Sequence, residues 1–384
     1  MSSFDARTFT FVRASGTKLV DARERQIFDA ISSVWTTIHG HCHPAIADAI
    51  ARQAAVLDHV TALGATHPVA EELAGRLAAL TGLDYAFFSS DGASAIEVAL
   101  KIALKYWHNA GDRRRTRFAR LVDAYHGDTA GAMSVSAIEA FKSPFGPICF
   151  DALTYDRLGE VLERDDLAAV VVEPTVQAAA GMRIVECSAY EPLRGNRMPL
   201  LVVDEIATGF GRTGSMFAFS QLGLQPDMLC LGKGLTGGTV ALSATLATER
   251  IYRAFLGDPD ADRHLFHGHS YAANPIACAA ALASLDLFET ERTLENVTAR
   301  STDLDAMLTR VSAHPHVRDV RRAGLMCGIE LDERDRARRT ARGLYDRGHF
   351  TRPIGSVVQL VPPLCSTSAE LSDFVDALLS ELNG

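Results

Sequence analysis

Short apolar runs that alternate with helical patterns are the feature that most constrains the fold of this chain. The runs are "YAFFSS", "RFARLVD", "LAAVVVEP", "PLLVVDE" and "DMLCLG", each of strand length. A strand that is apolar along its whole length is buried on both faces, and the connections between these runs leave room for crossover helices. We therefore predict an α/β fold with a mostly parallel central sheet and helices on both faces, which binds ligands at the carboxyl ends of its strands.

The C-terminal part of the chain has a different pattern. After about residue 285, long amphipathic helical patterns alternate with short strands such as "LMCGIEL" and "VVQLVPP". At 384 residues the chain is long enough for two domains. We predict an N-terminal segment, 1–40, that packs with the small domain, a large domain, 41–285, and a smaller C-terminal α+β domain, 286–384.

The composition argues against several classes of protein. The net charge of −9 argues against a surface for nucleic acid or for an anionic membrane. No segment has the run of about 20 apolar residues that a membrane span requires, and the first residues lack the apolar stretch of a signal peptide, so we expect a cytoplasmic protein. The seven cysteines are scattered without a CxxC pair, which predicts reduced structural thiols and no metal site.

One lysine occupies an unusual position. In "LCLGKGLTGG", Lys233 follows a buried strand and stands between glycines, where backbone can approach a ligand closely. Desolvation at such a place lowers the pKa of the amine and frees it to attack a carbonyl. The ordinary alternative is a lysine on a solvated face, which describes most of the lysines and arginines here.

Three other strand ends carry residues of chemical interest. Gly92 lies where "SSDGASAIE" passes from a strand into a helix, whose free N–H groups and positive end suit a phosphate. Asp204 ends the apolar strand of "LLVVDEIATGFGRTG", where a buried carboxylate needs a cationic or N–H partner. Tyr125 in "DAYHGDT" offers a ring that can stack on a flat ligand. The ordinary alternatives are a plain turn, an aspartate that caps a turn, and a core tyrosine.

One ligand accounts for all four features. A phosphate suits the helix end at Gly92, a protonated ring nitrogen suits Asp204, a planar ring suits Tyr125, and an aldehyde suits Lys233. Pyridoxal 5′-phosphate (PLP) has all of these groups. We therefore predict PLP as the cofactor.

A set of motifs in a fixed order extends this interpretation. The segments "TTIHGHCHP", "YHGDTAGAMSV", "DEIATGFGRTG", "LCLGKGLTGGT", "HGHSYAANPIACAAALASL" and "TRPIG" stand in the order found in the class III aminotransferases of PLP fold type I. Within that family, the sequence resembles most closely the 7,8-diaminopelargonic acid aminotransferases of biotin synthesis. The resemblance runs from about residue 15 to the C-terminus and implies transfer of an amino group from a small-molecule donor to a carbonyl acceptor.

The resemblance assigns roles around the cofactor. It implies that Lys233 bonds covalently to PLP and moves the substrate proton, and that Asp204 keeps the ring nitrogen protonated. Tyr125 would stack on the ring, while the amides of Gly92 and Ala93 would hold the phosphate. These expectations make Lys233, Asp204 and Tyr125 the candidate catalytic residues.

Two further cofactor positions follow from the same resemblance. Ile206 is expected to contact the cofactor. Ser270, in "HGHSY", matches a residue that reaches the phosphate of the neighbouring subunit, so a homodimer with shared active sites is expected.

The substrate side of the site is also implied by the resemblance. Arg352 of "TRPIG" matches the arginine that receives the acceptor carboxylate, a role that its planar guanidinium suits. Arg212 and Asp128 match polar pocket positions, although in the ordinary alternative they simply pair with each other. Trp35 and Gly268 are the other two positions expected to contact substrate.

The sequence also departs from the 7,8-diaminopelargonic acid subgroup. It lacks the "WHPYT"-like opening whose aromatic lines the acceptor pocket, and the paired "WW" before "IHG" is replaced by Val34 and Trp35. The loop before "LAAVVVEP" is short, and "VQGAGG" has become "VQAAAG". We therefore expect an altered acceptor pocket in which 7-keto-8-aminopelargonate is a poor acceptor, unless aromatics such as Trp35 or Phe350 replace the missing wall.

Two other functions remain open from the sequence. With the subgroup's donor, S-adenosylmethionine, the same cofactor chemistry could support γ-elimination, γ-replacement or C–C bond formation instead of amino transfer. A non-catalytic PLP-fold scaffold is the second alternative, and the presence of Lys233, Asp204 and Tyr125 argues against it.

Overall fold

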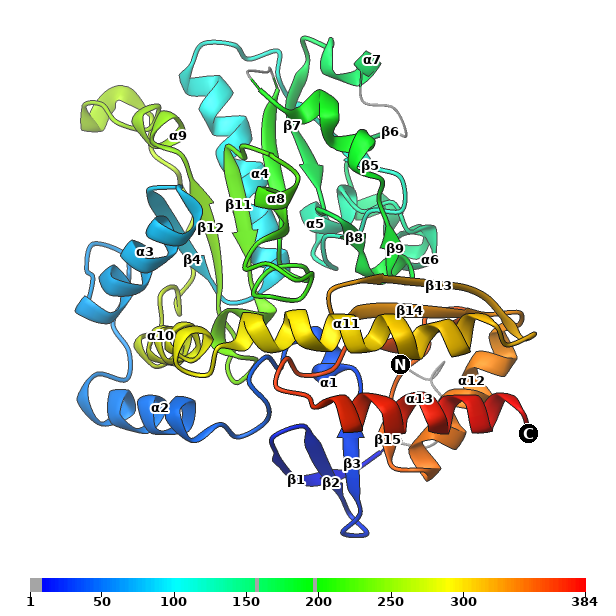
Figure 1. The fold of residues 1–384 in the computed structure, drawn as a ribbon. Coiled ribbons are helices and arrows are strands. Elements are labelled where there is room, and N and C mark those ends of the chain that lie inside the picture. Colours follow the sequence, from blue (N-terminus) through cyan, green and yellow to red (C-terminus); the bar gives the residue numbers. More distant parts are fainter. Residues whose placement is uncertain (1–8, 156–158, 196–198) are drawn as a thin grey trace.

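A seven-stranded sheet forms the centre of the molecule in the computed structural model, which describes residues 9–155, 159–195 and 199–384 (Figure 1). Strands β11, β10, β7, β5 and β6 pair in parallel, and β12 pairs antiparallel with β4 and β11. The predicted mostly parallel sheet is therefore confirmed. Its strands, in spatial order, are β4 (Tyr85–Ser89), β12 (Ser243–Ala247), β11 (Met228–Leu231), β10 (Leu200–Asp204), β7 (Leu167–Val172), β5 (Arg117–Leu121) and β6 (Leu153–Tyr155).

Strand β12 is absent from the sequence prediction although it lies inside the sheet. Its sequence, "SATLA", contains two hydroxyl residues and lacks the unbroken apolar character of its neighbours. Both hydroxyls are nevertheless satisfied, because Ser243 Oγ donates to Asp91 O at 2.7 Å and Thr245 Oγ1 donates to Ala95 O at 2.8 Å. A buried hydroxyl that bonds to a neighbouring helix terminus carries little penalty.

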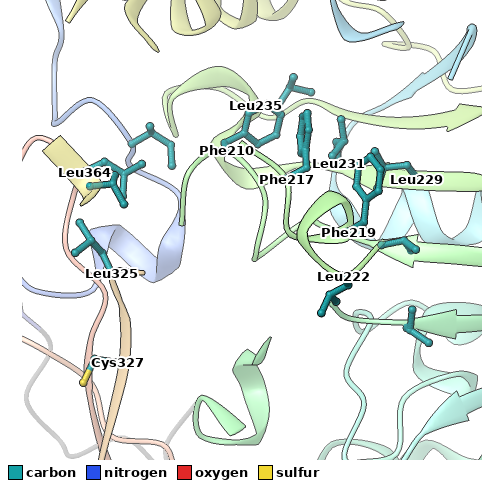
Figure 2. Packing of buried hydrophobic residues seen from close by; sticks show 14 of the residues in the cluster. Phe210, Phe217, Phe219, Leu222, Leu229, Leu231, Leu235, Leu325, Cys327 and Leu364 are labelled. Atoms are coloured by element: carbon teal, nitrogen blue, oxygen red, sulfur yellow. The ribbon is translucent and has the colours of Figure 1, made fainter. Parts of the chain in front are cut away.

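The strands are buried on both faces, as their apolar sequences predict. In β10, Val202 packs in the cluster that contains residues of helix α4 (Gly92–Asn109), whereas Leu201 and Val203 pack in the opposite cluster. Figure 2 shows part of that second cluster, where Phe217 and Phe219 lie beside residues of β11. The sheet is therefore covered on both faces, which leaves its strand ends as the accessible place for a ligand.

The C-terminal part forms a smaller α+β unit. Its three-stranded antiparallel sheet has the order β13 (Val317–Ala323), β14 (Met326–Leu331) and β16 (Val357–Leu360). Figure 1 shows two of its helices running side by side below the large sheet: α11 (Thr293–Ser312) and α13 (Ser368–Leu382). Helix α12 (Arg334–Asp346) completes it.

The described N-terminal residues pair with this C-terminal part. Strands β1 (Phe11–Ser15), β2 (Lys18–Asp21) and β3 (Gln26–Asp29) form an antiparallel sheet, and β15 (His349–Phe350) joins it by pairing in parallel with β3. Helix α10 (Pro275–Thr290) runs unbroken past residue 286. The boundaries 1–40, 41–285 and 286–384 stay a prediction, and residues 1–8 lie outside the described part.

The remaining elements are short or connect the larger ones. They are α1 (Ser32–Trp35), α2 (Pro44–Val56), α3 (Pro68–Thr81), α5 (Ala130–Ser134), α6 (Glu139–Lys142), α7 (Gly159–Leu162), α8 (Ala218–Gln221), α9 (Glu249–Arg253), β8 (Val176–Gln177) and β9 (Arg183–Ile184). Among the described residues, no helix has the length and apolar character needed to cross a bilayer.

Element α1 is a left-handed turn. All four of its residues have positive φ, with 49° at Ser32 and Ser33 and 67° at Val34 and Trp35. Each such residue costs about 1–2 kcal/mol when it is not glycine. Contacts with the segment after β16 hold the turn in place, because Ser32 Oγ donates to Val361 O at 2.6 Å and Val361 N donates to Ala30 O at 2.7 Å.

Candidate active site

A cavity of ≈ 460 Å³ lies at the carboxyl ends of β7, β10 and β11. Its lining contains eight of the residues predicted from the sequence: Trp35, Gly92, Ala93, Tyr125, Asp128, Asp204, Ile206 and Lys233. The other lining residues were not named as site residues from the sequence: Asp91, His126, Gly127, Thr129, Glu173, Ala178, Ala179, Ala207 and Thr208. Arg212, Gly268, Ser270 and Arg352 do not line the cavity.

Lys233 reaches the cavity from a 3₁₀ turn directly after β11. The turn spans Lys233–Thr236, and Lys233 itself has φ 38°. Desolvation by the surrounding protein lowers the pKa of its amine, while the charges of Asp204 and Glu173 act in the opposite direction. The amine lies 5.1 Å from the centre of the Trp35 ring. These surroundings favour a larger neutral fraction of the amine, as a nucleophile requires.

Asp204 ends β10 and has two partners. Its Oδ1 accepts a hydrogen bond from Ile206 N at 3.0 Å, so the aspartate does cap the turn after its strand. Its Oδ2 lies 2.7 Å from His126 Nδ1, and the side chains of Asp204 and His126 are both buried. Among the described residues, His126 Nε2 is buried without a hydrogen-bond partner. The pair is therefore a buried polar unit in the cavity wall.

Tyr125 and Glu173 form the next part of the wall. Tyr125 N donates to Glu173 Oε2 at 2.9 Å, and the Tyr125 ring lies 5.6 Å from the ring of Phe141 in an edge-on arrangement. Burial raises the pKa of Tyr125 well above its usual value, with a contribution from Asp128. Burial also raises the pKa of Glu173 to about 7. Glu173 ends an apolar strand as Asp204 does, and that shared position is the sequence signal that could have revealed it.

The first turn of α4 forms a cradle at the cavity. Asp91 caps the helix by accepting from Ser94 N at 3.0 Å, so the amides of Gly92 and Ala93 belong to the first turn, which has no intrahelical acceptors. A Cβ at Gly92 would lie 2.8 Å from Ile206 Cγ2. Only glycine therefore lets Ile206 and the helix end approach each other this closely.

These features fit PLP by the chemistry of the side chains present. The α4 N-terminus suits the phosphate, the Asp204–His126 pair suits a protonated ring nitrogen, and Lys233 supplies an amine with a lowered pKa. The Tyr125 ring and Ile206 stand on the same cavity. The glycine cradle at the α4 N-terminus and the Asp204 carboxylate in the cavity wall are the features that a bound cofactor would complete.

Arg212 lies away from the cavity surface. Its guanidinium is buried and donates to Pro362 O at 2.6 Å and to Thr37 O at 2.7 Å. Burial lowers its pKa to about 9. The structure shows no contact between Arg212 and Asp128, so the alternative in which they pair is wrong. Two carbonyl groups far apart in sequence hold the guanidinium instead.

Two predicted substrate positions, Arg352 and Gly268, and the predicted cofactor position Ser270 lie outside the cavity of this chain. Arg352 is exposed on the segment between β15 and β16. Gly268 and Ser270 lie in an exposed segment before α10. Trp35 does line the cavity, and its Nε1 donates to Gln359 Oε1 at 2.9 Å. Phe350, the other aromatic considered for the wall, packs against Phe9 and Phe11 at ring distances of 5.7 and 5.3 Å.

The chain is similar to known aminotransferases over almost its whole length. The model of the class III aminotransferase family matches residues 2–382. The adenosylmethionine-8-amino-7-oxononanoate aminotransferase of Nitratidesulfovibrio vulgaris is 43% identical, over 94% of this chain and 74% of the relative. The enzyme of the same name from Aquifex aeolicus is 38% identical, over 96% of this chain and 90% of the relative.

Two solved structures share the fold. The adenosylmethionine-8-amino-7-oxononanoate aminotransferase of Methanocaldococcus jannaschii has a TM-score of 0.91 at 35% identity, covering 99% of this chain and 94% of its own. An amine transaminase from an uncultivated Pseudomonas species, in its PLP-bound form, has a TM-score of 0.94 at 30% identity, covering 100% and 97%. The predicted family, fold and cofactor are confirmed, and the elimination alternative gains no support. The chain belongs to the class III aminotransferases and is a PLP-dependent transferase of fold type I.

Proposed function

We propose that this enzyme transfers an amino group from S-adenosylmethionine to 8-amino-7-oxononanoate, which is the same compound as 7-keto-8-aminopelargonate. The names of two relatives, both adenosylmethionine-8-amino-7-oxononanoate aminotransferases, support this substrate pair. The observation that carries the proposal is the cavity in which Lys233, Asp204 and the α4 N-terminus meet. Bound PLP supplies an aldehyde that condenses with amines and a protonated ring that draws electrons from the substrate Cα.

Each residue around the cavity has a separate role in amino transfer. Lys233 holds the cofactor covalently at rest and then moves a proton to and from the substrate Cα. Asp204 keeps the ring nitrogen protonated, and His126 fixes the orientation of that carboxylate through its Nδ1. Tyr125 and Ile206 hold the ring from the sides, and the first turn of α4 binds the phosphate.

The acceptor side is proposed to use Trp35 and Arg352. Trp35 stands in the cavity wall near Lys233, which supports the view that an aromatic from this turn replaces the one missing at the N-terminus. Ala178, Ala179 and Ala207 line the same cavity and leave apolar space for a methylene chain. Arg352 would receive the acceptor carboxylate, with Asp128 as a further polar contact. Arg212 would act from behind this wall by holding two backbone segments together.

A homodimer is part of the proposal. The segment with Gly268 and Ser270 is exposed here and carries neighbours with large apolar exposure, namely Phe266 at 79% and Tyr271 at 66%. Leu63, beside Gly268, is exposed at 68%. Such a patch is typical of a surface that another subunit covers, and in that arrangement Ser270 would reach the partner's phosphate site. The cytoplasmic location stays a prediction.

A donor and acceptor assay tests the proposal. Purified enzyme with PLP is mixed with S-adenosylmethionine, and conversion of the cofactor to pyridoxamine phosphate is followed by absorbance. Addition of 8-amino-7-oxononanoate should then regenerate PLP and give a diamine detectable by mass spectrometry. Release of methylthioadenosine without pyridoxamine phosphate would instead favour elimination. If no diamine forms, 8-amino-7-oxononanoate is a poor acceptor, as the departures from the subgroup led us to expect.

A further inference from the structure

Gln359 connects two parts of the acceptor side. It lies on β16 and is 3% exposed. Both the oxygen and the nitrogen of its side-chain amide form hydrogen bonds. Oε1 accepts from Trp35 Nε1 at 2.9 Å, and Nε2 donates to Arg352 O at 2.5 Å. Its backbone carbonyl also accepts from Thr351 Oγ1 at 2.6 Å. One side chain therefore holds the cavity-lining indole and the segment that carries Arg352.

The turn that carries Trp35 depends on such outside contacts. Its four left-handed residues, Ser32–Trp35, are unfavourable on their own, because none of them is glycine. At the first residue of the turn, Ser32 Oγ donates to Val361 O. At its last residue, the Trp35 indole donates to the Gln359 side chain. Both partners belong to β16 and the residue that follows it. The position of the Trp35 ring over Lys233 is thus set from the small C-terminal unit.

We propose that Gln359 is a positioning residue that determines how the enzyme binds its amino acceptor. It fixes Trp35 and the Arg352 segment at once, so the distance between the apolar wall and the carboxylate-binding arginine depends on one amide. This inference rests on the proposed function, which assigns Trp35 and Arg352 to the acceptor. No other neutral side chain of this length both accepts from the indole and donates to the carbonyl.

The geometry separates this role from cofactor chemistry. Lys233, Asp204 and His126 come from the large sheet and its loops, and the hydrogen bonds of Asp204 and His126 do not involve Gln359. Gln359 reaches Lys233 through the Trp35 ring, which lies 5.1 Å from the Lys233 amine. Loss of the Gln359 amide should therefore leave the first half-reaction with the donor nearly intact. It should instead weaken productive binding of the acceptor, because misplacement of a positioning group raises KM before it affects the proton transfer.

The test uses two variants and a matched control. Gln359→Met removes both hydrogen bonds at similar volume, and Gln359→Glu keeps an acceptor for the indole but loses the donor to Arg352 O. Gln53→Met makes the same chemical change in α2, where Nε2 donates to Leu57 O at 2.8 Å. The holoenzyme of each is examined for KM and kcat with 8-amino-7-oxononanoate, and for the rate of the S-adenosylmethionine half-reaction.

We expect KM for the acceptor to rise about tenfold in Gln359→Met, with kcat and the donor half-reaction within about twofold of wild type. Gln359→Glu should be intermediate, and Gln53→Met should match wild type. Trp35→Phe removes the donor atom of the same bond, so the double variant Trp35→Phe/Gln359→Met should raise KM by less than the product of the two single effects. Unfolding temperatures show whether each variant is folded.

Three outcomes would overturn the inference. One is a folded Gln359→Met enzyme with an unchanged acceptor KM. Another is an equal fall in the donor and acceptor half-reactions, which is the mark of a general structural role. The third is full additivity with Trp35→Phe.

Failure of the proposed function would look different from these outcomes. It would appear in wild type as no pyridoxamine phosphate formation from S-adenosylmethionine. Binding of 8-amino-7-oxononanoate to enzyme loaded with pyridoxamine phosphate, followed by intrinsic fluorescence, needs no turnover. It therefore tests Gln359 even in that case, and the Gln359→Met variant should show a matching loss of affinity.

Discussion

The cofactor side and the acceptor side of the cavity are built in different ways. The cofactor side comes from the ends of β7, β10 and β11 and the start of α4, and its polar groups pair with one another over short distances. The acceptor side joins Trp35, near the N-terminus, to Gln359, 324 positions later, and the Arg212 side chain to the backbone of Pro362. In the proposed function, the large sheet therefore positions the residues that act on the cofactor, whereas the residues assigned to the acceptor are positioned by contacts between distant segments.

The largest expected effect is on the cofactor side, at Lys233. Lys233→Ala should lower turnover by about 10⁴-fold or more, because the covalent link and the proton-moving amine are both lost. The phosphate and ring contacts remain, so the variant should still bind PLP without the covalent bond. Steady-state rates and cofactor retention after gel filtration measure the two results. Turnover within tenfold of wild type would remove Lys233 from the mechanism.

Arg352→Ala should impair acceptor binding and leave the cofactor chemistry intact, unlike Lys233→Ala. Loss of the guanidinium should weaken acceptor binding by about 2–4 kcal/mol, because an acceptor carboxylate would lose its charged partner. The S-adenosylmethionine half-reaction should change little. Acceptor KM and the donor half-reaction rate are the two measurements. If the donor half-reaction slowed as much as acceptor binding weakened, the acceptor side would not be separate from the cofactor side.

The pH dependence of stability should report on Glu173, on the cofactor side. Burial raises its pKa to about 7, so the folded state favours the protonated carboxyl. Its contribution to stability is fully present below the ordinary pKa of 4.5 and is lost as the pH rises through about 7. Relative to wild type, Glu173→Gln should therefore gain about 1–3 kcal/mol of unfolding free energy between pH 5 and pH 8.

Denaturant unfolding without cofactor measures this difference. Glu205→Gln should show the same sign, because burial raises the pKa of Glu205 to about 7 as well. A difference between wild type and Glu173→Gln that does not vary with pH would mean that Glu173 is ionised across the whole range.

The smallest expected effect is at Val34, on the acceptor side. Val34 has φ 67° and is 41% exposed, so glycine relieves left-handed strain and loses little buried surface. After the extra chain entropy of glycine is subtracted, Val34→Gly should stabilise the protein by about 0.5–1 kcal/mol. Val12→Gly, at an exposed position in β1, should destabilise it by a similar amount. If both substitutions changed the unfolding free energy in the same direction, Val34 would not be under left-handed strain.

The sequence predicted the cofactor side better than the acceptor side, for a physical reason. Lys233, Asp204 and Tyr125 each end an apolar run, and strand ends of a parallel sheet meet at one edge, so local pattern was enough. Their partners His126 and Glu173 were missed, because a partner is defined by a contact and not by its own pattern.

The acceptor side gave no local signal of this kind. The left-handed turn at Ser32–Trp35 contains no glycine that would mark it. Likewise, no local feature tells that Arg212 bonds to carbonyls at Thr37 and Pro362. Both features arise from contacts that exist only after distant segments have met.

The parallel pairing of β3 with β15 has a consequence for the order in which the enzyme is made. On the ribosome, β3 emerges early, but His349–Phe350 must be synthesised before its edge has a partner. The strands and helices of the large sheet are complete well before that point, and long-range pairings of this kind form slowly. The nascent chain can therefore assemble its cofactor-binding part while its selectivity is still absent. In the proposed function, the acceptor-binding residues would therefore reach their final positions only after the C-terminal part has been synthesised.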